Sequence, residues 1–516
     1  MKVLYTLVGN LVSKQYNHVS WHRHRQKKSY TYPLPILAYA SELKEKAQDF
    51  EIRFLVPHSI FTRYVSSIEE LSCIDKLKAL FMEDLLNYHR NRFLSFKNNP
   101  KGDLRKLIEF LEKADVDREL ISELREREES KVTDRLEKLE NELLLQLQQK
   151  DRAFRESTQL EKAKVEIVPS VGGYAFRDFK VSYRAESSYR KLAFFLLFAR
   201  DVLKHIDTQD TEFILDLSTG LNALVTEAID AFYSASVLSD FFYLGRKAGH
   251  KFFVIEAEPV IGADTSEEKS YRKEEVKKKA FFKNPLSGKD IKKHVKKLGT
   301  VLEPDRLSSA LEQSLLLFNI LNYNLPLGLT LLAELPTWGE FIGLLRYMNE
   351  SLVEKATALK LSKNAQGYSF GPMVPELDFK SVRDVMFMLM LGANISYQLE
   401  TESIKASDSM SLNDLKKFLG LYRKYGLYVN ETFLERELTN KKAICKKKLK
   451  SNQTRLLIHL ENKVRASKRT DTLKRNFLAH CGLLADFTCV RREGKDIVFF
   501  YDKGRAQEIT RIISEL

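Results

Sequence analysis

Near the C-terminus, Arg475 and His480 stand five positions apart, between a strongly basic segment and an apolar run. An arginine can hold a phosphate group, and a histidine can move protons near neutral pH. Together these two side chains could cleave RNA without a metal ion. Asn476 follows the arginine and lies four positions before His480, so the two share one face of a helix.

Arg475 and His480 would not point the same way on a single helix. Each residue turns an α-helix by about 100°, so a separation of five residues places the two side chains about 140° apart. One copy of the motif therefore cannot easily direct both side chains onto one phosphate. A two-fold axis presents the same surface twice, so two facing copies could do so. The spacing predicts a composite site at the seam of a homodimer.

The same Arg-to-His spacing occurs twice more in the chain. Arg53 and His58 bracket a run of Phe, Leu and Val that ends at a proline, which is typical of a β-strand. Arg200 and His205 lie at the polar end of an apolar helix. Neither arginine is followed by Asn, and the spacing alone is a weak signal. We therefore interpret these two pairs as structural and the third pair as the candidate site.

The charge of the chain favours polyanionic partners, because its 516 residues carry a net charge of +14 with a pI near 9.2. Residues 441–475 hold 13 Lys and Arg against only Glu461 and Asp471. This segment could be a solvated, lysine-rich helix face. Beside a ribonuclease motif, a binding surface for a phosphate backbone is the better interpretation. The hydrophobic content of 44% predicts cored domains, about three at this length.

The four cysteines form no Cys-x-x-Cys pair, so neither a disulfide framework nor a structural zinc site is indicated. His22 and His24 have no cysteine or carboxylate at ligand spacing, which favours a mobile loop over a metal site. The apolar run at the N-terminus is too short for a signal peptide, and no run of 18 apolar residues predicts a membrane span. We expect a cytoplasmic protein with no metal and no membrane contact.

The N-terminal half alternates predicted strands and helices, which favours a doubly wound, Rossmann-like domain at residues 1–265. Strands are expected at 3–8, 51–57, 165–170, 213–217 and 251–255, and helices at 33–46, 188–205 and 223–243. Residues 68–164 are dense in charge and nearly free of glycine, which predicts a long helical insertion. Its heptad-like apolar spacing suits a helical pair that covers its own stripe or docks on a partner; the spacing comes from Val132, Leu136, Leu139 and Leu143.

Two polar turns follow strands of this domain, at the sheet edge where such folds bind ligands. The first contains Gly9 and Asn10, and the second contains Ser218, Thr219, Gly220 and Asn222. Glycine lets a backbone approach a ligand, and hydroxyl groups at a helix N-terminus can donate to a phosphate. An ordinary turn with a capping residue is the alternative. The Gly-x-Gly-x-x-Gly pattern is absent, which argues against an NAD dehydrogenase.

The C-terminal half is predicted to be helical. Residues 266–300, rich in Lys and Glu, are expected to form a linker to a helical domain at residues 301–516. Helices are expected at 304–323, 338–361, 382–399, 412–425, 455–466 and 506–516. Ser411 and Asn413 are candidate caps for one of these helices. A small β-hairpin is expected from residues 487–490 and 497–501.

Both motifs resemble those of known families. The pattern Arg-Asn-x-x-Ala-His-x-Gly at residues 475–482 is similar to the signature of HEPN ribonucleases. The pattern Asp-Leu-Ser-Thr-Gly-Leu-Asn at residues 216–222, with Gly9 and Asn10, resembles the ligand loops of CARF domains, the Rossmann-fold sensors of CRISPR systems. Thr219 stands where many CARF domains have His. The whole chain resembles the CARF–HEPN ancillary ribonucleases of type III CRISPR systems.

The resemblance implies a metal-independent endoribonuclease for antiviral defence, which cuts single-stranded RNA and needs no cofactor. Its activator would be a cyclic oligoadenylate such as cyclic tetra-adenylate, bound at a CARF dimer by Gly9, Asn10, Ser218, Thr219, Gly220 and Asn222. Its catalytic residues would be Arg475, Asn476 and His480, in a homodimer that is compatible with larger assemblies. Two other classes stay open: a nucleotide-sensing regulator that binds nucleic acid without cutting it, and a helical nuclease whose Rossmann-like part is only a dimer scaffold.

Overall fold

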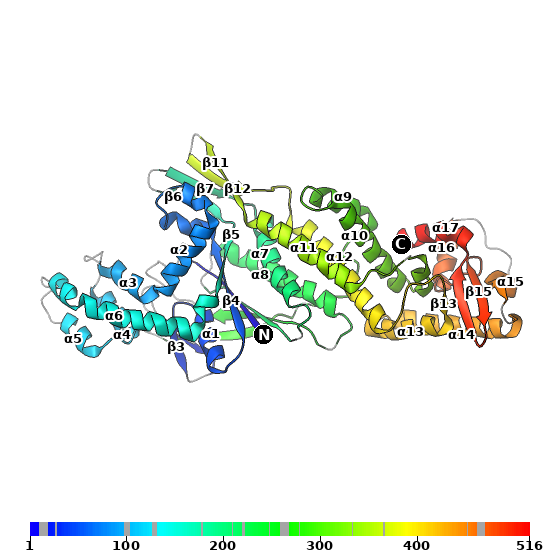
Figure 1. The fold of residues 1–516 in the computed structure, drawn as a ribbon, viewed down its shortest axis with the longest axis horizontal. Coiled ribbons are helices and arrows are strands. Elements are labelled where there is room, and N and C mark those ends of the chain that lie inside the picture. Colours follow the sequence, from blue (N-terminus) through cyan, green and yellow to red (C-terminus); the bar gives the residue numbers. More distant parts are fainter. Residues whose placement is uncertain are drawn as a thin grey trace.

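An eight-stranded sheet organises the N-terminal half in the computed structural model (Figure 1). The structure describes residues 1–9, 19–25, 28–97, 104–125, 132–176, 179–208, 210–218, 222–246, 248–258, 268–277, 279–332, 334–364, 367–450, 453–461 and 470–516. The strand order is β3-β2-β10-β9-β8-β1-β4-β5. The bounds are β1 Lys2–Leu7, β2 Val19–Arg23, β3 Ser29–Tyr32, β4 Phe50–Pro57, β5 Lys164–Val168, β8 Glu212–Asp216, β9 Lys251–Ala257 and β10 Lys269–Glu275.

The strands β9, β8, β1, β4 and β5 run parallel, and β1 lies between β4 and β8. The order along the sheet therefore reverses beside β1, as in doubly wound folds. Alternate residues of β1 enter the cores on opposite faces, with Tyr5 on one side and Leu4 on the other. Helix α1 (Pro35–Glu45) packs on the Leu4 face, and α7 (Ser187–Lys204) and α8 (Asn222–Tyr243) pack on the Tyr5 face. The predicted Rossmann-like domain is confirmed.

The helical insertion between β4 and β5 is also confirmed, and it projects from one end of the molecule (Figure 1). Its helices are α2 Ile74–Leu86, α3 Tyr88–Lys97, α4 Leu104–Lys113, α5 Arg118–Arg125 and α6 Val132–Thr158. Leu143 and Leu147 of α6 join a small separate core with side chains of α3, α4 and α5. Within the described residues, the insertion therefore covers much of its own apolar surface.

Two segments expected to lack regular structure contain strands. The region of His22, interpreted as a loop, contains the antiparallel hairpin β2–β3. The predicted linker, residues 266–300, contains β10, which pairs with β9 and β2, and helix α9 (Gly288–Leu298). Only Tyr271 of β10 is buried, and its other side chains are mostly charged. Backbone hydrogen bonds hold this strand in the sheet, so the order of its apolar and polar side chains does not predict it.

The C-terminal half is a helical assembly with one small sheet, β13-β16-β15-β14. Its helices are α10 Pro304–Asn322, α11 Trp338–Thr357, α12 Phe379–Thr401, α13 Leu412–Lys424, α14 Tyr428–Lys448, α15 Leu457–Glu461, α16 Thr470–Ala479 and α17 Ala506–Ser514. The strands are β13 Met410–Ser411, β14 Thr454–Leu456, β15 Thr488–Glu493 and β16 Asp496–Tyr501. The predicted hairpin is confirmed in β15 and β16.

Three local expectations in this half need comment. Ser411 caps α13 in a capping box with Asp414, whereas Asn413 lies inside the helix. The helix expected at 455–466 is wrong at its start, because β14 ends at Leu456 and α15 follows. Helix α14 was not predicted, because its mixture of charged and apolar residues has little amphipathic pattern.

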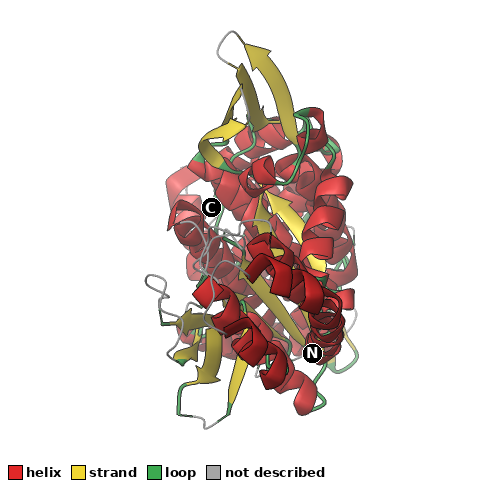
Figure 2. Ribbon diagram, turned by 90° about the vertical axis from the view of Figure 1, so that its left-hand side faces the viewer, coloured by secondary structure: helices red, strands yellow, loops and turns green. Residues whose placement is uncertain are grey.

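The two halves share one core. Helix α12 is buried along nearly its whole length and packs against α7 and α8 as well as α10 and α11. A second sheet, β11-β12-β7-β6, also joins the halves and stands out from the helices (Figures 1 and 2). Its strands are β6 Val171–Phe176, β7 Phe179–Arg184, β11 Leu359–Asn364 and β12 Gly367–Pro372. Among the described helices, none has the length and apolar character needed to cross a membrane.

Candidate functional site

Helix α16 and the turn after it carry the three predicted catalytic residues. Arg475 is exposed, Asn476 is half-buried, and the side chain of His480 is 33% exposed. The His480 N–H donates to the Asn476 carbonyl oxygen at 3.1 Å, so the helical path continues to the histidine. The two residues therefore lie one turn apart, as the spacing predicts.

The turn after His480 fixes where the helix stops. Cys481 and Gly482 both have left-handed backbone, with φ of 53° and 72°, and the Gly482 N–H donates to the Phe477 carbonyl oxygen at 2.9 Å. A side chain at Gly482 would also lie 2.9 Å from the Tyr501 hydroxyl. Glycine is required here on both grounds, and the turn holds His480 at the C-terminal end of α16.

Glu437 on α14 contacts the predicted catalytic histidine: its Oε1 lies 3.1 Å from Nδ1 of His480. Lys441, one turn further along α14, contacts the same oxygen at 3.0 Å and also pairs with Glu461. Burial acts to raise the pKa of Glu437, but His480 and Lys441 outweigh it, so the pKa lies below its usual value. The ionised carboxylate favours the tautomer with the hydrogen on Nδ1, and in that tautomer Nε2 is the proton acceptor.

Arg475 and Asn476 have no such support. Among the described residues, neither side chain forms a hydrogen bond or an ion pair. The structure thus joins His480 to Glu437 and leaves the Arg475 guanidinium open to solvent, where it can receive an anion.

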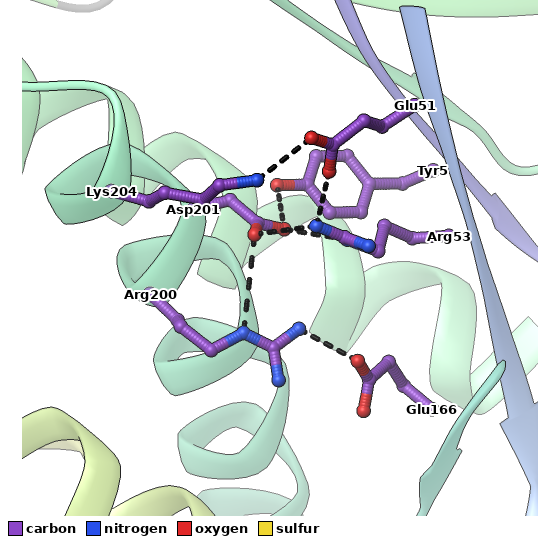
Figure 3. A network of polar contacts seen from close by, with 7 residues as sticks. All are labelled: Tyr5, Glu51, Arg53, Glu166, Arg200, Asp201 and Lys204. Carbon is purple, nitrogen blue, oxygen red and sulfur yellow. Dashed lines mark hydrogen bonds and ion pairs between the residues drawn. The ribbon is translucent and has the colours of Figure 1, made fainter. Parts of the chain in front are cut away.

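The other two Arg–His pairs are structural, as expected. Arg53 is 2% exposed and donates to Asp201 through Nε at 3.2 Å and Nη2 at 3.1 Å, and Tyr5 donates to the same carboxylate at 2.8 Å (Figure 3). Arg200 donates to Glu166 at 2.7 Å. Both guanidinium groups are occupied within the fold (Figure 3).

The two predicted ligand turns follow the carboxyl ends of two neighbouring strands of the large sheet. Gly9 follows β1 and Ser218 follows β8, and these strands are neighbours where the strand order reverses. Ligands of doubly wound folds bind in the crevice at this point. Asn10, Thr219 and Gly220 lie outside the described residues, and Asn222 begins α8.

Asp216 anchors the second turn. Its buried carboxylate accepts hydrogen bonds from the Ser218 hydroxyl at 2.6 Å, the Ser218 N–H at 3.0 Å and the Thr6 hydroxyl at 3.2 Å. Burial raises the pKa of Asp216, and these hydrogen bonds oppose the rise. An open cavity of about 670 Å³ lies beside Ser218, with Val225 and Tyr233 of α8 in its wall. In the described segments, no group of three or more His, Cys, Asp or Glu could hold a metal ion.

Two family models match this chain. The CARF-domain model of the CRISPR system endoribonuclease Csx1 matches residues 3–259, and the HEPN-domain model of that endoribonuclease matches residues 427–503. This chain belongs to the CARF–HEPN ribonucleases of CRISPR systems. No curated protein matches it. The HEPN match begins as α14 begins, so both Glu437 and His480 lie within it.

Within the HEPN domain, reasoning from sequence missed Glu437 and Lys441. Their spacing of four on a helix is a signal for an ion pair, but many surface helices carry such pairs. No residue pattern near Glu437 indicates that α14 lies against His480, 43 positions later. Only the tertiary contact reveals the role of this carboxylate.

Proposed function

We propose that this CARF–HEPN ribonuclease is activated by a cyclic oligoadenylate and cuts single-stranded RNA without a metal ion, as a cytoplasmic homodimer in antiviral defence. The contact between Glu437 and Nδ1 of His480 carries this proposal. It supports an imidazole whose outer nitrogen can take a proton, beside an arginine that is free to bind a phosphate.

The cleavage step uses these groups in turn. Nε2 of His480 takes the proton of the RNA 2′-hydroxyl, and the 2′-oxygen attacks the adjacent phosphorus. The bond from phosphorus to the 5′-oxygen breaks, and this oxygen takes a proton from the His480 imidazolium, which returns the ring to its neutral form. The products are a 2′,3′-cyclic phosphate and a 5′-hydroxyl. Glu437 stabilises the imidazolium that forms, Arg475 stabilises the charge on the pentacoordinate phosphate, and Asn476 helps to orient the ring.

An exposed apolar stripe on α14 supports the homodimer. Val429 and Phe433 lie two turns and one turn before Glu437 on the same helix face, and they are 67% and 55% exposed. Tyr428 beside them is 65% exposed. Clustered exposed side chains of this kind are typical of an interface. A composite site built from two copies needs an interface beside His480, because Arg475 and His480 are about 140° apart on one helix.

Helix α8 supports coupling between the two domains. It begins at the turn that contains Ser218, the sensor turn, and its other end lies against α12. There the Asn394 amide donates to the carbonyl oxygens of Phe242 at 2.5 Å and Leu244 at 3.2 Å. The Tyr425 hydroxyl donates to Asn394 at 2.7 Å, and Tyr425 lies three residues before α14. A displacement of α8 by the activator would therefore reach the helix that carries Glu437.

The test is a cleavage assay with labelled single-stranded RNA in EDTA, with and without cyclic tetra-adenylate. We expect cutting only when the activator is present. Cutting in the absence of the activator would show that the CARF domain is only a dimer scaffold. Binding without cutting, with or without added Mg²⁺, would contradict the nuclease, and cutting that returns only with Mg²⁺ would contradict metal independence.

A further inference from the structure

The small sheet β11-β12-β7-β6 has one face lined by small residues. Its central strands pair Ser182 with Ser369, and the outer strands add Gly173 and Ser362 to the same row. Residues opposite one another across neighbouring strands share a face. The Ser362 and Ser369 hydroxyls are 2.7 Å apart. A row of small residues therefore crosses all four strands, with Ser362 exposed and Ser369 buried.

The same face carries three cations. Lys180 and Arg184 lie two residues to either side of Ser182, and Lys360 lies two residues before Ser362, so strand alternation puts all three on this face. All three are exposed and form no ion pair or hydrogen bond with the residues that the structure describes. The sequences of the four strands contain no Asp or Glu, so this face has an uncompensated positive charge.

The opposite face of the sheet is turned toward the protein. Tyr183 and Phe370 stack there with ring centroids 5.4 Å apart, and both contact the ring of His58. Both are almost fully buried. Lys363 belongs to this side, because the register pairs it with Tyr368, and its Nζ lies 5.5 Å from that ring. Among the described residues, the face with Lys180, Arg184 and Lys360 is the one turned away from this aromatic cluster.

The dimensions of this face fit an extended anionic chain. A cavity of about 450 Å³ lies over it, with Lys180, Ser182 and Arg184 in its lining. Lys180 and Arg184 are about 13 Å apart along their strand, and Lys360 lies about 10 Å from that strand, across two strand spacings. Such separations span several phosphates, and the small residues between the cations let a chain approach the sheet. We propose that this face binds the ribose-phosphate backbone of the single-stranded RNA substrate, outside the nuclease site.

This inference rests on the proposed function, because it assigns a second contact to the same RNA. The test uses full-length protein with His480→Ala, which we expect to bind RNA without cutting it. Its affinity for a labelled RNA of about 20 nucleotides is measured at several salt concentrations. The same measurement is made on a triple variant that also carries Lys180→Gln, Arg184→Gln and Lys360→Gln. We expect about tenfold weaker binding at low salt and a salt slope smaller by about 2, because each phosphate contact to a single strand contributes about 0.7.

The matched control is Lys363→Gln, on the same strand as Lys360 but on the other face, which should leave affinity and slope unchanged. Lys360→Gln alone should reduce the slope by about 0.7. Unchanged RNA binding by the triple variant would overturn the proposal and leave this face to a protein partner, as would an equal loss in Lys363→Gln. RNA binding is measured without cleavage, so the two proposals can fail separately. If the parent protein cuts no RNA but the triple variant still has a smaller salt slope, only the proposed nuclease activity is contradicted.

Discussion

Arg53 and Arg475 each precede a histidine by five positions, yet the fold gives them opposite environments. Arg53 is enclosed in the CARF domain and satisfied by the buried carboxylate of Asp201 (Figure 3). Arg475 is exposed on the HEPN domain. A guanidinium that is already paired inside a protein is committed to structure, whereas an open one can bind a phosphate.

The histidines of the two regions differ in the same way. Burial lowers the pKa of His58 to about 4, against a weaker opposing effect of the Leu71 carbonyl oxygen, so its ring is neutral at physiological pH. His480 is partly exposed and held by an ionised carboxylate at Nδ1. The comparison teaches that the same Arg–His spacing can hold a buried, neutral histidine or one that meets both solvent and a charged partner, and only the second arrangement suits proton transfer.

The largest expected effect separates the two regions by chemistry. His480→Ala and Arg475→Ala should each reduce the rate of RNA cleavage by about 10²–10⁴-fold, the range that a proton-transfer group supplies. Because both side chains are at least partly exposed, the thermal unfolding midpoint and the affinity for the activator should stay unchanged. Single-turnover cleavage of labelled RNA measures the loss. Full activity in either variant would remove that residue from the site.

The converse change should affect stability and not chemistry. Arg53→Met removes the guanidinium that donates two hydrogen bonds to the buried Asp201 carboxylate and leaves Arg200, at 3.9 Å, as its ion-pair partner. Removing one partner of a buried ion pair typically costs about 3–5 kcal/mol. We expect the unfolding transition of the protein to move to lower urea concentration, while cleavage per folded molecule is retained. Arg475→Met is the matched control, with an effect within about 0.5 kcal/mol. Equal stability of the two variants would contradict the distinction between these arginines.

The contrast between Arg53 and Arg475 was visible in sequence because apolar neighbours predicted a buried strand around the first. The parallel sheet, the helical insertion and the hairpin near the C-terminus were also predictable, since each depends on local periodicity. Strand β10 was not, because Tyr271 alone is buried among charged residues and backbone pairing defines the strand. The site was half predictable: a short motif revealed His480, but its partner Glu437 comes from a distant helix.

A smaller effect should follow from changing the partner of His480. Glu437→Gln keeps the shape but removes the charge that stabilises the imidazolium, so kcat should fall about 10- to 100-fold, less than the 10²–10⁴-fold supplied by the proton-transfer group itself, with little change in KM. Glu437→Asp should recover part of the rate. The control is Glu435→Gln, an exposed carboxylate on the same helix that lies two residues away and so points to another side of it. Equal rates for both Gln variants would show that Glu437 does not position the histidine.

The pH dependence of Glu437→Gln follows from the lowered pKa of Glu437. A carboxylate with a lowered pKa in the folded state stabilises the fold fully above its unfolded pKa of about 4.3, and this contribution is lost as the pH falls through the folded value. The difference in unfolding midpoint between the parent and Glu437→Gln should therefore be constant from neutral pH to about 5 and shrink below about 4.3. A difference that grows on acidification would contradict the assigned charge.

The smallest effect is expected at the sensor turn, far along the chain from both arginines. Ser218→Ala removes the hydroxyl that donates to Asp216 at 2.6 Å, which should loosen the turn beside the strand-order reversal. A hydrogen bond of about 1 kcal/mol corresponds to roughly a fivefold rise in the activator concentration for half-maximal cleavage. The rate at saturating activator should not change, because the HEPN residues are untouched. Ser234→Ala, on α8 and away from this turn, is the control. An unchanged activation curve for Ser218→Ala would exclude this turn from sensing, and a reduced maximal rate would show that α8 controls catalysis and not only activation.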